Sequence, residues 1–396
     1  MMSRHRLPPP DAEAAAHSQR LARHIAEEIA ARGPLPFAQF MALALYAPGL
    51  GYYSAGARKF GAGGDFVTAP ELGPAFAHAL GHHLAGAMAG LPDWQLLELG
   101  AGSGALAADL LLALERRAAL PARYRILEVS ADLRERQLQT VQARCPHLLA
   151  RVDWLDAPPA QAWRGAVIGN EVVDALPATR FALREDGIHE QYVSGGPDEF
   201  AWLELPAPPA VAGLVQARLA DRRGELPLPY RSELHATLGP WLAAVTDRLE
   251  RGLVLLVDYG YPRSEYYLPE RRDGTLVCHY RHHGHDDPLI LVGLQDITAF
   301  VDFTALAEAA MACGLEVAGY TSQAQFLIGN DIEGYLAHAD SLDFAGRLRL
   351  VGAVKTLMLP GQMGERFQMM ALTRGIDGEA LHGFGHDLRY RLLPRP

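Results

Sequence analysis

The sequence contains little cysteine and has no long uninterrupted apolar run. Its three cysteines, Cys145, Cys278 and Cys313, are far apart and form no CxxC pair, which argues against a disulfide framework or a structural zinc site. No stretch provides the roughly 18 consecutive apolar residues that indicate a transmembrane helix, so we expect no membrane insertion. The N-terminal residues also lack the apolar segment of a secretory signal, and we therefore expect a cytoplasmic protein.

An excess of positive charge is missing as well. The 396 residues include 36 Lys and Arg against 46 Asp and Glu, so the formal net charge is −10. Proteins that bind phosphate backbones without specificity are usually basic, so nucleic-acid binding is disfavoured, whereas a basic segment of a partner protein would be attracted. The length exceeds that of one typical core, so we expect one large domain with additions, or two domains. The sequence does not predict an oligomeric state.

Strand-like and helix-like segments alternate through the middle of the chain. Helices are predicted at about residues 75–89, 105–116 and 131–144, with short apolar strands between them and another apolar strand in "RGLVLLVDYG". Such alternation is typical of a parallel sheet with helices on both faces. We therefore predict an α/β fold: a Rossmann-like, largely parallel seven-stranded sheet with helices on both faces. Residues 183–230 and 259–300 are irregular and are predicted as insertions, and a helix is predicted over 232–250.

The N-terminal segment differs from the rest. Residues 1–74 are predicted as a helical cap with a glycine-rich lid, and residues 75–396 as the main domain. The stretch "GDFVTAPELG" contains Asp65 and Thr68 and is expected to lead into a helix. It has two interpretations: a lid that closes over the end of a cofactor, or an ordinary helix cap.

Three glycines connect a buried strand to a helix in "LLELGAGSGALAADLL". Gly100, Gly102 and Gly104 would allow a tight turn and a close approach of a ligand to the backbone. No Lys-Ser or Lys-Thr pair follows, so a P-loop is excluded. The glycines fit both a dinucleotide fingerprint and the S-adenosyl-L-methionine loop of class I methyltransferases, and they do not separate the two.

Acidic residues near the ends of successive strands are more informative. Glu98 has no obvious role beside a pyrophosphate, but it suits a ligand with a sulfonium and an amino group. Glu128 lies 28 positions after Gly100, against roughly 20 in the dinucleotide pattern, and could accept both ribose hydroxyls. Asp153 could accept the adenine amino group, and Trp154 could lie against the base. Each acid alone could instead cap a helix; together with the glycines they favour S-adenosyl-L-methionine.

A second group follows the next strand in "GNEVVDALP". We expect Asn170 at the cofactor, and Glu171, Asp174 and Asp258 at the acceptor. Carboxylates can orient a planar guanidinium and favour loss of its proton during attack. The alternative is a helix N-cap followed by a first-turn acid. The histidines of "HYRHHGHDD" lie in a predicted loop without fixed ligand geometry, so we predict no metal site.

Several longer motifs carry a family resemblance. "GDFVTAPE", "LLELGAGSG", "NEVVDALP", "VDYG", "GTLVCHYRHHGHDDP", "QDITAFVDF" and "MGERFQMM" together resemble the MidA family, from about Phe37 to Ala371. These S-adenosyl-L-methionine-dependent methyltransferases are related to the mitochondrial complex I assembly factor. The resemblance implies S-adenosyl-L-methionine as cofactor and a protein arginine as acceptor, with a respiratory-chain subunit as the candidate partner. No mitochondrial presequence is evident, which favours a bacterial cytoplasmic protein. Two rival hypotheses are an NAD-dependent oxidoreductase and a non-catalytic assembly factor.

Overall fold

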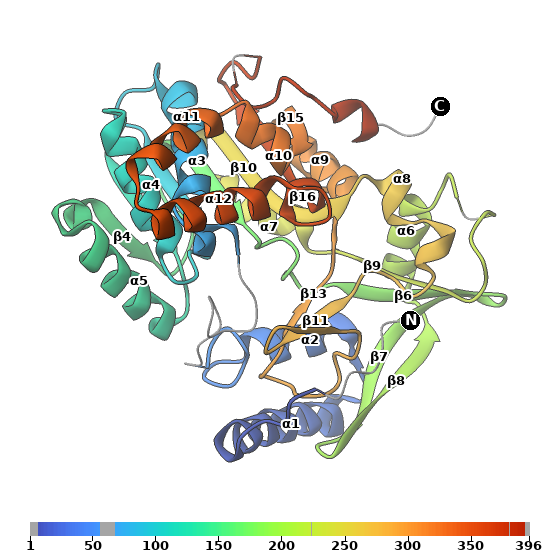
Figure 1. Cartoon of the computed structure of the whole chain (residues 1–396). Helices are drawn as coiled ribbons and strands as arrows, with labels where there is room; N and C mark the ends of the chain where they lie inside the picture. The colour runs from blue at the N-terminus through green and yellow to red at the C-terminus, as the bar shows by residue number, and fades with distance from the viewer. Residues whose placement is uncertain (1–6, 56–67, 223, 380, 393–396) are drawn as a thin grey trace.

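The computed structural model describes residues 7–55, 68–222, 224–379 and 381–392. Its centre is a mixed seven-stranded sheet, which confirms the predicted fold class (Figure 1). Six strands run in one direction and β16 runs against its two neighbours. The spatial order is β15 (Glu316–Ser322), β16 (Phe367–Arg374), β10 (Leu249–Tyr261), β5 (Trp163–Asn170), β2 (Gln95–Leu99), β3 (Arg123–Leu127) and β4 (Val152–Leu155). The two-residue β14 (Val301–Asp302) pairs with the end of β10.

Helices cover both faces of this sheet, and β10 has apolar side chains on both faces for them to bury. Leu253 and Leu255 belong to one hydrophobic core, whereas Val254 and Leu256 belong to the other, because successive side chains of a strand point to opposite faces. The first core includes residues of α3 (Ala75–Met88), α4 (Ala105–Arg116), α5 (Ala131–Arg144), α10 (Gln323–Ile328), α11 (Ile332–Ala337), α12 (Phe344–Met358) and α13 (Met363–Arg366). The second includes residues of α7 (Leu238–Thr246) and α9 (Phe303–Ala312).

The helix predicted over 232–250 is confirmed only in its middle, as α7, and its predicted bounds are wrong. The segment instead begins in β9 (Tyr230–Leu234), continues as the shorter α7, and passes into β10 at Leu249. β9 pairs with β6 (Thr179–Arg184), for example at Phe181 opposite Ser232. This pairing joins residues about fifty positions apart, and such tertiary contacts override the local preference for a helix.

The N-terminal helices and the two irregular stretches form a second body beside the main sheet (Figure 1). An antiparallel sheet contains β1 (Leu35–Pro36), β6, β7 (Gly187–Gly196), β8 (Glu199–Pro206) and β9, and a smaller one contains β11 (Val277–Tyr280), β12 (His283–His285) and β13 (Asp296–Thr298). α1 (Ala12–Arg32) and α2 (Phe37–Tyr46) share one core with β7, β11 and β13, through Leu21, Phe40, Val193, Cys278 and Ile297. α6 (Pro209–Arg218) and α8 (Arg263–Tyr266) pack into a neighbouring cluster.

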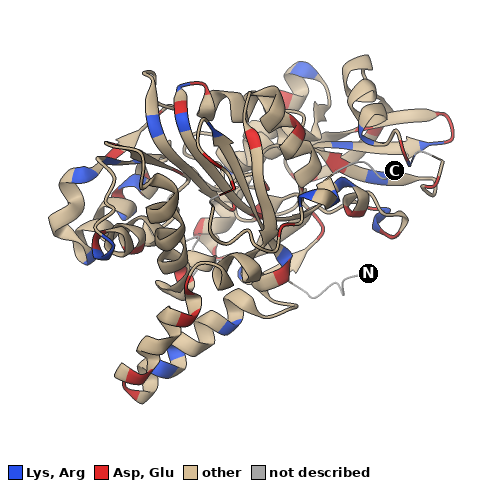
Figure 2. Ribbon diagram, turned by 90° about the horizontal axis from the view of Figure 1, so that it is seen from above, with Lys and Arg blue, Asp and Glu red and all other residues tan. Residues whose placement is uncertain are grey.

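Charge is mixed over the surface of the molecule. Lys and Arg are interspersed with Asp and Glu along the ribbon, and the described residues present no extended basic stripe (Figure 2). Within the same part of the chain, none of the helices has the length and apolarity needed to cross a membrane.

Candidate active site

A cavity of about 970 Å³ opens at the carboxyl ends of β2, β3, β5 and β10. Most of its polar lining comes from two parts of the molecule. Strand ends of the main sheet contribute Glu98, Gly100, Gly102, Glu128, Asn170, Glu171 and Asp174, and the second body contributes Tyr46, Tyr53, His279, Asp296 and Phe300. Ligands of open α/β sheets bind at this edge because the loops that leave the parallel strands meet there.

The glycine turn forms one end of the cavity. Gly100, Gly102 and Gly104 have φ values of 61°, 54° and 82°. Residues other than glycine rarely adopt such positive φ values. Gly100 and Gly102 line the cavity, whereas Gly104 does not. A Cβ atom at Gly104 would lie 2.8 Å from the Cα atom of Gln137. Gly104 therefore permits close packing of the turn on α5 rather than direct access for a ligand.

Two carboxylates flank this turn. Glu98 is 2% exposed and accepts a hydrogen bond of 2.7 Å from the Tyr124 hydroxyl. Burial raises the pKa of Glu98 to about 7, although the Tyr124 hydrogen bond opposes the shift. Glu98 lines the cavity, so a cationic ligand beside it would stabilise its charged form.

Glu128 is oriented toward the glycine turn. Its Oε1 accepts a hydrogen bond of 2.9 Å from the Ser130 backbone N–H, and its Oε2 accepts one of 3.1 Å from Gln137. The same Gln137 amide donates to the carbonyl oxygen of Gly102 at 3.1 Å. Burial raises the pKa of Glu128. Gln137 thus fixes Glu128 and the glycine turn relative to each other, and both face the cavity.

Asp153 and Trp154 do not line the cavity. β4 continues to Leu155, so both residues lie within the strand instead of ending it. Asp153 forms an ion pair with Arg123, whose Nε donates to it at 2.7 Å. The Trp154 indole donates to the Oε1 of Gln137 at 3.0 Å. Trp154 is therefore connected to the site only through Gln137, and Asp153 is engaged elsewhere.

Asn170 and Glu171 leave β5 on an unusual backbone. Glu171 has a φ of 53°, which costs a non-glycine residue about 1–3 kcal/mol and is concentrated at functional sites. Asn170 Nδ2 donates to Glu171 Oε1 at 3.1 Å, while Asn170 Oδ1 is buried without a hydrogen-bond partner among the described residues. Burial, followed by the charge of Asp174, raises the pKa of Glu171 to about 8.

Asp174 and Asp258 have different positions. Asp174 lines the cavity, and its buried Oδ1 has no hydrogen-bond partner within the described ranges. Burial raises the pKa of Asp174 to about 6, although a hydrogen bond with the Tyr259 hydroxyl opposes the shift. Asp258 is 0% exposed and does not line the cavity. Burial and the charges of Asp174 and Glu171 raise the pKa of Asp258. Asp258 contacts the backbone of the loop that carries Asp174 and so supports the site from outside the cavity.

The segment before α3 borders the same cavity. Thr68 is buried, lines the cavity and precedes the short 3-10 helix Ala69–Leu72, without a side-chain capping hydrogen bond. The carboxylate of Glu71, which sequence reasoning mentioned only as part of a motif, accepts a hydrogen bond from the Ser103 hydroxyl in the glycine turn. Asp65 and most of the predicted lid lie outside the described residues.

Sequence reasoning missed the contribution of the second body. The Tyr46 and Tyr53 rings stack at 5.6 Å, and the Tyr53 hydroxyl donates to Asp296 at 2.9 Å. The Tyr46 hydroxyl donates to the carbonyl oxygen of Ala175 at 2.9 Å. The available signal was the aromatic content of the segment around Tyr53 and the position of Asp296 in "QDITAFVDF". Neither indicates that the two segments meet.

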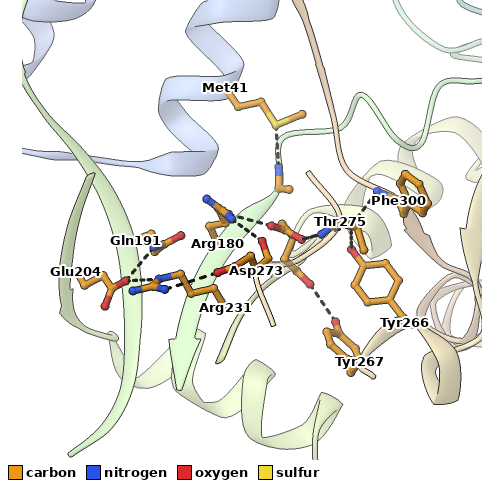
Figure 3. A network of polar contacts seen from close by, with 12 residues as sticks. Met41, Arg180, Gln191, Glu204, Arg231, Tyr266, Tyr267, Asp273, Thr275 and Phe300 are labelled. Carbon is orange, nitrogen blue, oxygen red and sulfur yellow. Dashed lines mark hydrogen bonds and ion pairs between the residues drawn. The ribbon is translucent and has the colours of Figure 1, made fainter. Parts of the chain in front are cut away.

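A polar network fixes this part of the wall (Figure 3). The buried Glu233 of β9 accepts hydrogen bonds from Arg180 at 2.9 Å and from the Thr275 backbone N–H at 2.8 Å. Thr275 Oγ1 in turn accepts a hydrogen bond of 3.2 Å from the backbone N–H of Phe300, and Phe300 packs edge-on against Tyr259. The network therefore positions the aromatic ring of Phe300, which lines the cavity.

The order and direction of the strands in the main sheet are those of the class I S-adenosyl-L-methionine-dependent methyltransferase fold. Residues 79–321 match a family model described as "Putative S-adenosyl-L-methionine-dependent methyltransferase". The match covers more than half of the sequence, and the chain belongs to this family.

Similar proteins agree with this assignment. A protein from Burkholderia thailandensis, crystallised with S-adenosyl-homocysteine bound, is 42% identical and superposes with a TM-score of 0.89 over 96% of this chain and 98% of that chain. Protein arginine methyltransferase NDUFAF7, mitochondrial, from Danio rerio is 28% identical, with 90% of this chain and 87% of that protein covered. The Homo sapiens protein of the same name is 27% identical, with 88% and 82% covered.

The cofactor is S-adenosyl-L-methionine, which sets aside the dinucleotide interpretation of the glycine turn. The residues present fit this cofactor. Glu128 presents a carboxylate beside the turn, as ribose hydroxyls require. Glu98 and the unpartnered Asn170 Oδ1 offer acceptors for a cationic, amino-bearing group.

Proposed function

We propose that this protein is an S-adenosyl-L-methionine-dependent methyltransferase whose acceptor is an arginine side chain of a protein. The observation that carries the proposal is the position of Glu171 and Asp174 in the same cavity as the glycine turn. The names of the NDUFAF7 relatives, which are protein arginine methyltransferases, support the same acceptor class. A respiratory-chain subunit is the first partner to test, because of the MidA resemblance.

The acceptor half of the cavity suits a cation. Glu171, Asp174 and Asp296 contribute three carboxyl groups to the cavity lining, and Tyr46, Tyr53 and Tyr259 contribute aromatic rings. Burial holds the pKa of Glu171 at about 8 and that of Asp174 at about 6, so ionising both without a bound cation is unfavourable. A guanidinium supplies a permanent positive charge and a planar set of donors that carboxylates accept bidentately.

When bound, S-adenosyl-L-methionine supplies an electrophilic methyl group. Glu128, Glu98 and the glycine turn would hold it at one end of the cavity, and Asn170 would accept from its amino group. Glu171 and Asp174 would hold the guanidinium so that one nitrogen faces the methyl carbon; such positioning accounts for much of the rate of a displacement. Glu171 or Asp174 would accept the proton that the guanidinium nitrogen loses when it takes the methyl group.

The second hypothesis, a non-catalytic assembly factor, also predicts cofactor binding but no methyl transfer. The two separate in a labelling experiment. A lysate of a strain lacking this protein is incubated with methyl-tritiated cofactor and either the wild-type protein or Glu171→Gln. We expect the wild type to label at least one protein band and Glu171→Gln to lose that band while it still binds S-adenosylhomocysteine. Binding by both proteins without a labelled band would favour the assembly factor.

A further inference from the structure

α12 presents an unusual apolar face to solvent. Phe344 is 84% exposed, Leu348 64% and Leu359, directly after the helix, 44%. Residues 344, 348, 352, 355 and 359 fall on one side of a helix because a turn takes 3.6 residues, and all five are exposed. Leu350, Val354 and Leu357 pack inward on the main core. We call Phe344, Leu348, Gly352, Lys355 and Leu359 the α12 stripe.

The charge of this helix is opposite to that of the whole chain. The chain has a net charge of −10, but α12 contains Arg347, Arg349 and Lys355 and no acidic residue. Arg347 pairs with the exposed Asp340 at 3.3 Å. A solvated apolar stripe among basic side chains matches an apolar segment that carries acidic residues.

The C-terminal end of α12 borders the cavity, although none of the five stripe residues lines it. Thr356, near the C-terminal end of α12, lines the cavity, and so do Gln362, Met363 and Arg366 immediately after it. Along the helix axis, Leu348 and Phe344 lie roughly 12 and 18 Å from Thr356, at 1.5 Å per residue. In Figure 1, α12 extends along the helical layer that covers one face of the main sheet.

We infer that the α12 stripe docks the acceptor protein, through an apolar and acidic segment close in sequence to the arginine that enters the cavity. The inference rests on the proposed function and names a recognition feature of its substrate. An extended chain covers about 3.3 Å per residue, so spans of roughly 12 and 18 Å place the docking segment about four to six residues from the arginine. Specificity then comes from two places: an acidic cavity that takes the arginine and a basic, apolar helix that takes its neighbours.

The test compares full-length variants in the tritium-labelling experiment described above. Phe344→Ser combined with Leu348→Ser should lower the rate of labelling of the acceptor band by about tenfold or more, as loss of interface anchors does. Arg349→Glu combined with Lys355→Glu should lower it as well. Met311→Ser is the matched control, because Met311 is a 60% exposed apolar residue of another helix. It should leave labelling unchanged, and all variants should bind S-adenosylhomocysteine like the wild type.

Peptides provide the second measurement. Synthetic peptides with one arginine and one Leu-Glu-Leu-Phe-Glu segment, separated by zero to twelve residues, are compared as acceptors. We expect a maximum near the spacing given above, which the serine variant abolishes. Equal labelling by wild type and variants overturns docking but leaves the arginine proposal intact, whereas an unlabelled lysate overturns both. Docking is also overturned if the serine substitutions abolish a dimer in sedimentation velocity, or abolish binding to anionic phospholipid vesicles, without changing labelling.

Discussion

The Asp258 carboxylate accepts a hydrogen bond of 3.2 Å from the backbone N–H of Asp174. The same oxygen accepts a hydrogen bond of 2.9 Å from the backbone N–H of Val173. The other oxygen accepts one of 2.9 Å from the backbone N–H of Tyr259. A residue of β10 thereby fixes the loop that leaves β5, on which Glu171 and Asp174 lie. The Glu171 backbone N–H also donates to the carbonyl oxygen of Val257 in β10, at 2.8 Å, so β10 holds the backbone on both sides of the positive φ of Glu171.

Removing that support should destabilise the fold. Asp258→Ala leaves three backbone N–H groups without their acceptor, and each buried unsatisfied donor costs about 1–3 kcal/mol. We expect the free energy of unfolding to fall by about 3 kcal/mol or more. Asp258→Asn is the matched variant, because it keeps the shape and one acceptor oxygen, and it should lose less than half as much. Urea denaturation measures both, and equal losses would contradict the supporting role.

Glu171 should reduce stability as the pH rises. Its pKa is about 8 in the folded protein against an ordinary value of 4.5, so the folded state binds more protons than the unfolded state between these pH values. Stability contributed by the protonated group is present at low pH and is lost as the pH rises toward 8. We expect Glu171→Gln to be more stable than wild type by about 1–3 kcal/mol at pH 8, with little difference near pH 4.5. A difference that is constant with pH in thermal unfolding would refute this interpretation.

Methyl transfer should depend on pH through the same groups. A guanidinium binds carboxylates in their charged form, and the pKa values of Asp174 and Glu171 are raised to about 6 and about 8. Activity at subsaturating acceptor should therefore be low below pH 6 and rise until about pH 8. In Glu171→Asp, the pH at which activity completes its rise near pH 8 should shift. Glu115→Asp is the control, because the Glu115 carboxylate contacts the exposed His147, and its activity profile should match that of the wild type. A wild-type profile that is flat from pH 6 to 9 would contradict a role for these carboxylates.

Gln137 should contribute to the affinity of the protein for its cofactor. Gln137→Leu removes the amide that joins Glu128 to Gly102, and we expect the affinity for S-adenosylhomocysteine to fall by about tenfold, the equivalent of 1.4 kcal/mol. Gln139→Leu is the matched control on the same helix, since the exposed Gln139 amide donates to the Glu135 carboxylate, at 2.7 Å, away from the cavity. It should change the affinity by less than threefold. Calorimetric titration compares them, and equal losses would show that any packing defect of α5 has the same effect.

Thr275 should affect the acceptor and spare the cofactor. Thr275→Val keeps the shape of the side chain but removes the oxygen that accepts from the backbone of Phe300. We expect the KM for the acceptor to rise several-fold with an unchanged affinity for S-adenosylhomocysteine. Thr246→Val is the control, because Thr246 is also buried but its hydroxyl donates to the Leu242 carbonyl within α7. Loss of cofactor affinity in Thr275→Val would indicate a general folding defect.

The sequence predicts the main sheet well because its signals are local. The glycines of the turn, the apolar run of β10 and the helices after each strand are all recognisable within short windows. Asp153 and Trp154 were expected at the end of their strand, but β4 continues to Leu155. Both residues look the same inside a strand as at its end, and Asp153 pairs with Arg123 of the neighbouring strand β3 and does not line the cavity.

The rest depends on contacts between distant segments. Tyr53 and Asp296 are 243 positions apart and meet only because α2 and β13 share a core. β9 looked helical because its pairing partner β6 is about fifty residues away. Local propensity contains no information about such pairs, so the contribution of the second body to the cavity could not be predicted. The strand-end residues Glu128, Glu171 and Asp174 were named from short motifs, and they do line the cavity.

The central claim is tested most directly by identifying the methylated amino acid. The band labelled by the wild-type protein with methyl-tritiated cofactor is hydrolysed to amino acids and separated against methylarginine and methyllysine standards. The account predicts that the radioactivity co-migrates with methylarginine and is absent when Glu171→Gln replaces the wild type. Radioactivity in methyllysine or another methylated residue, or full labelling by Glu171→Gln, would contradict it.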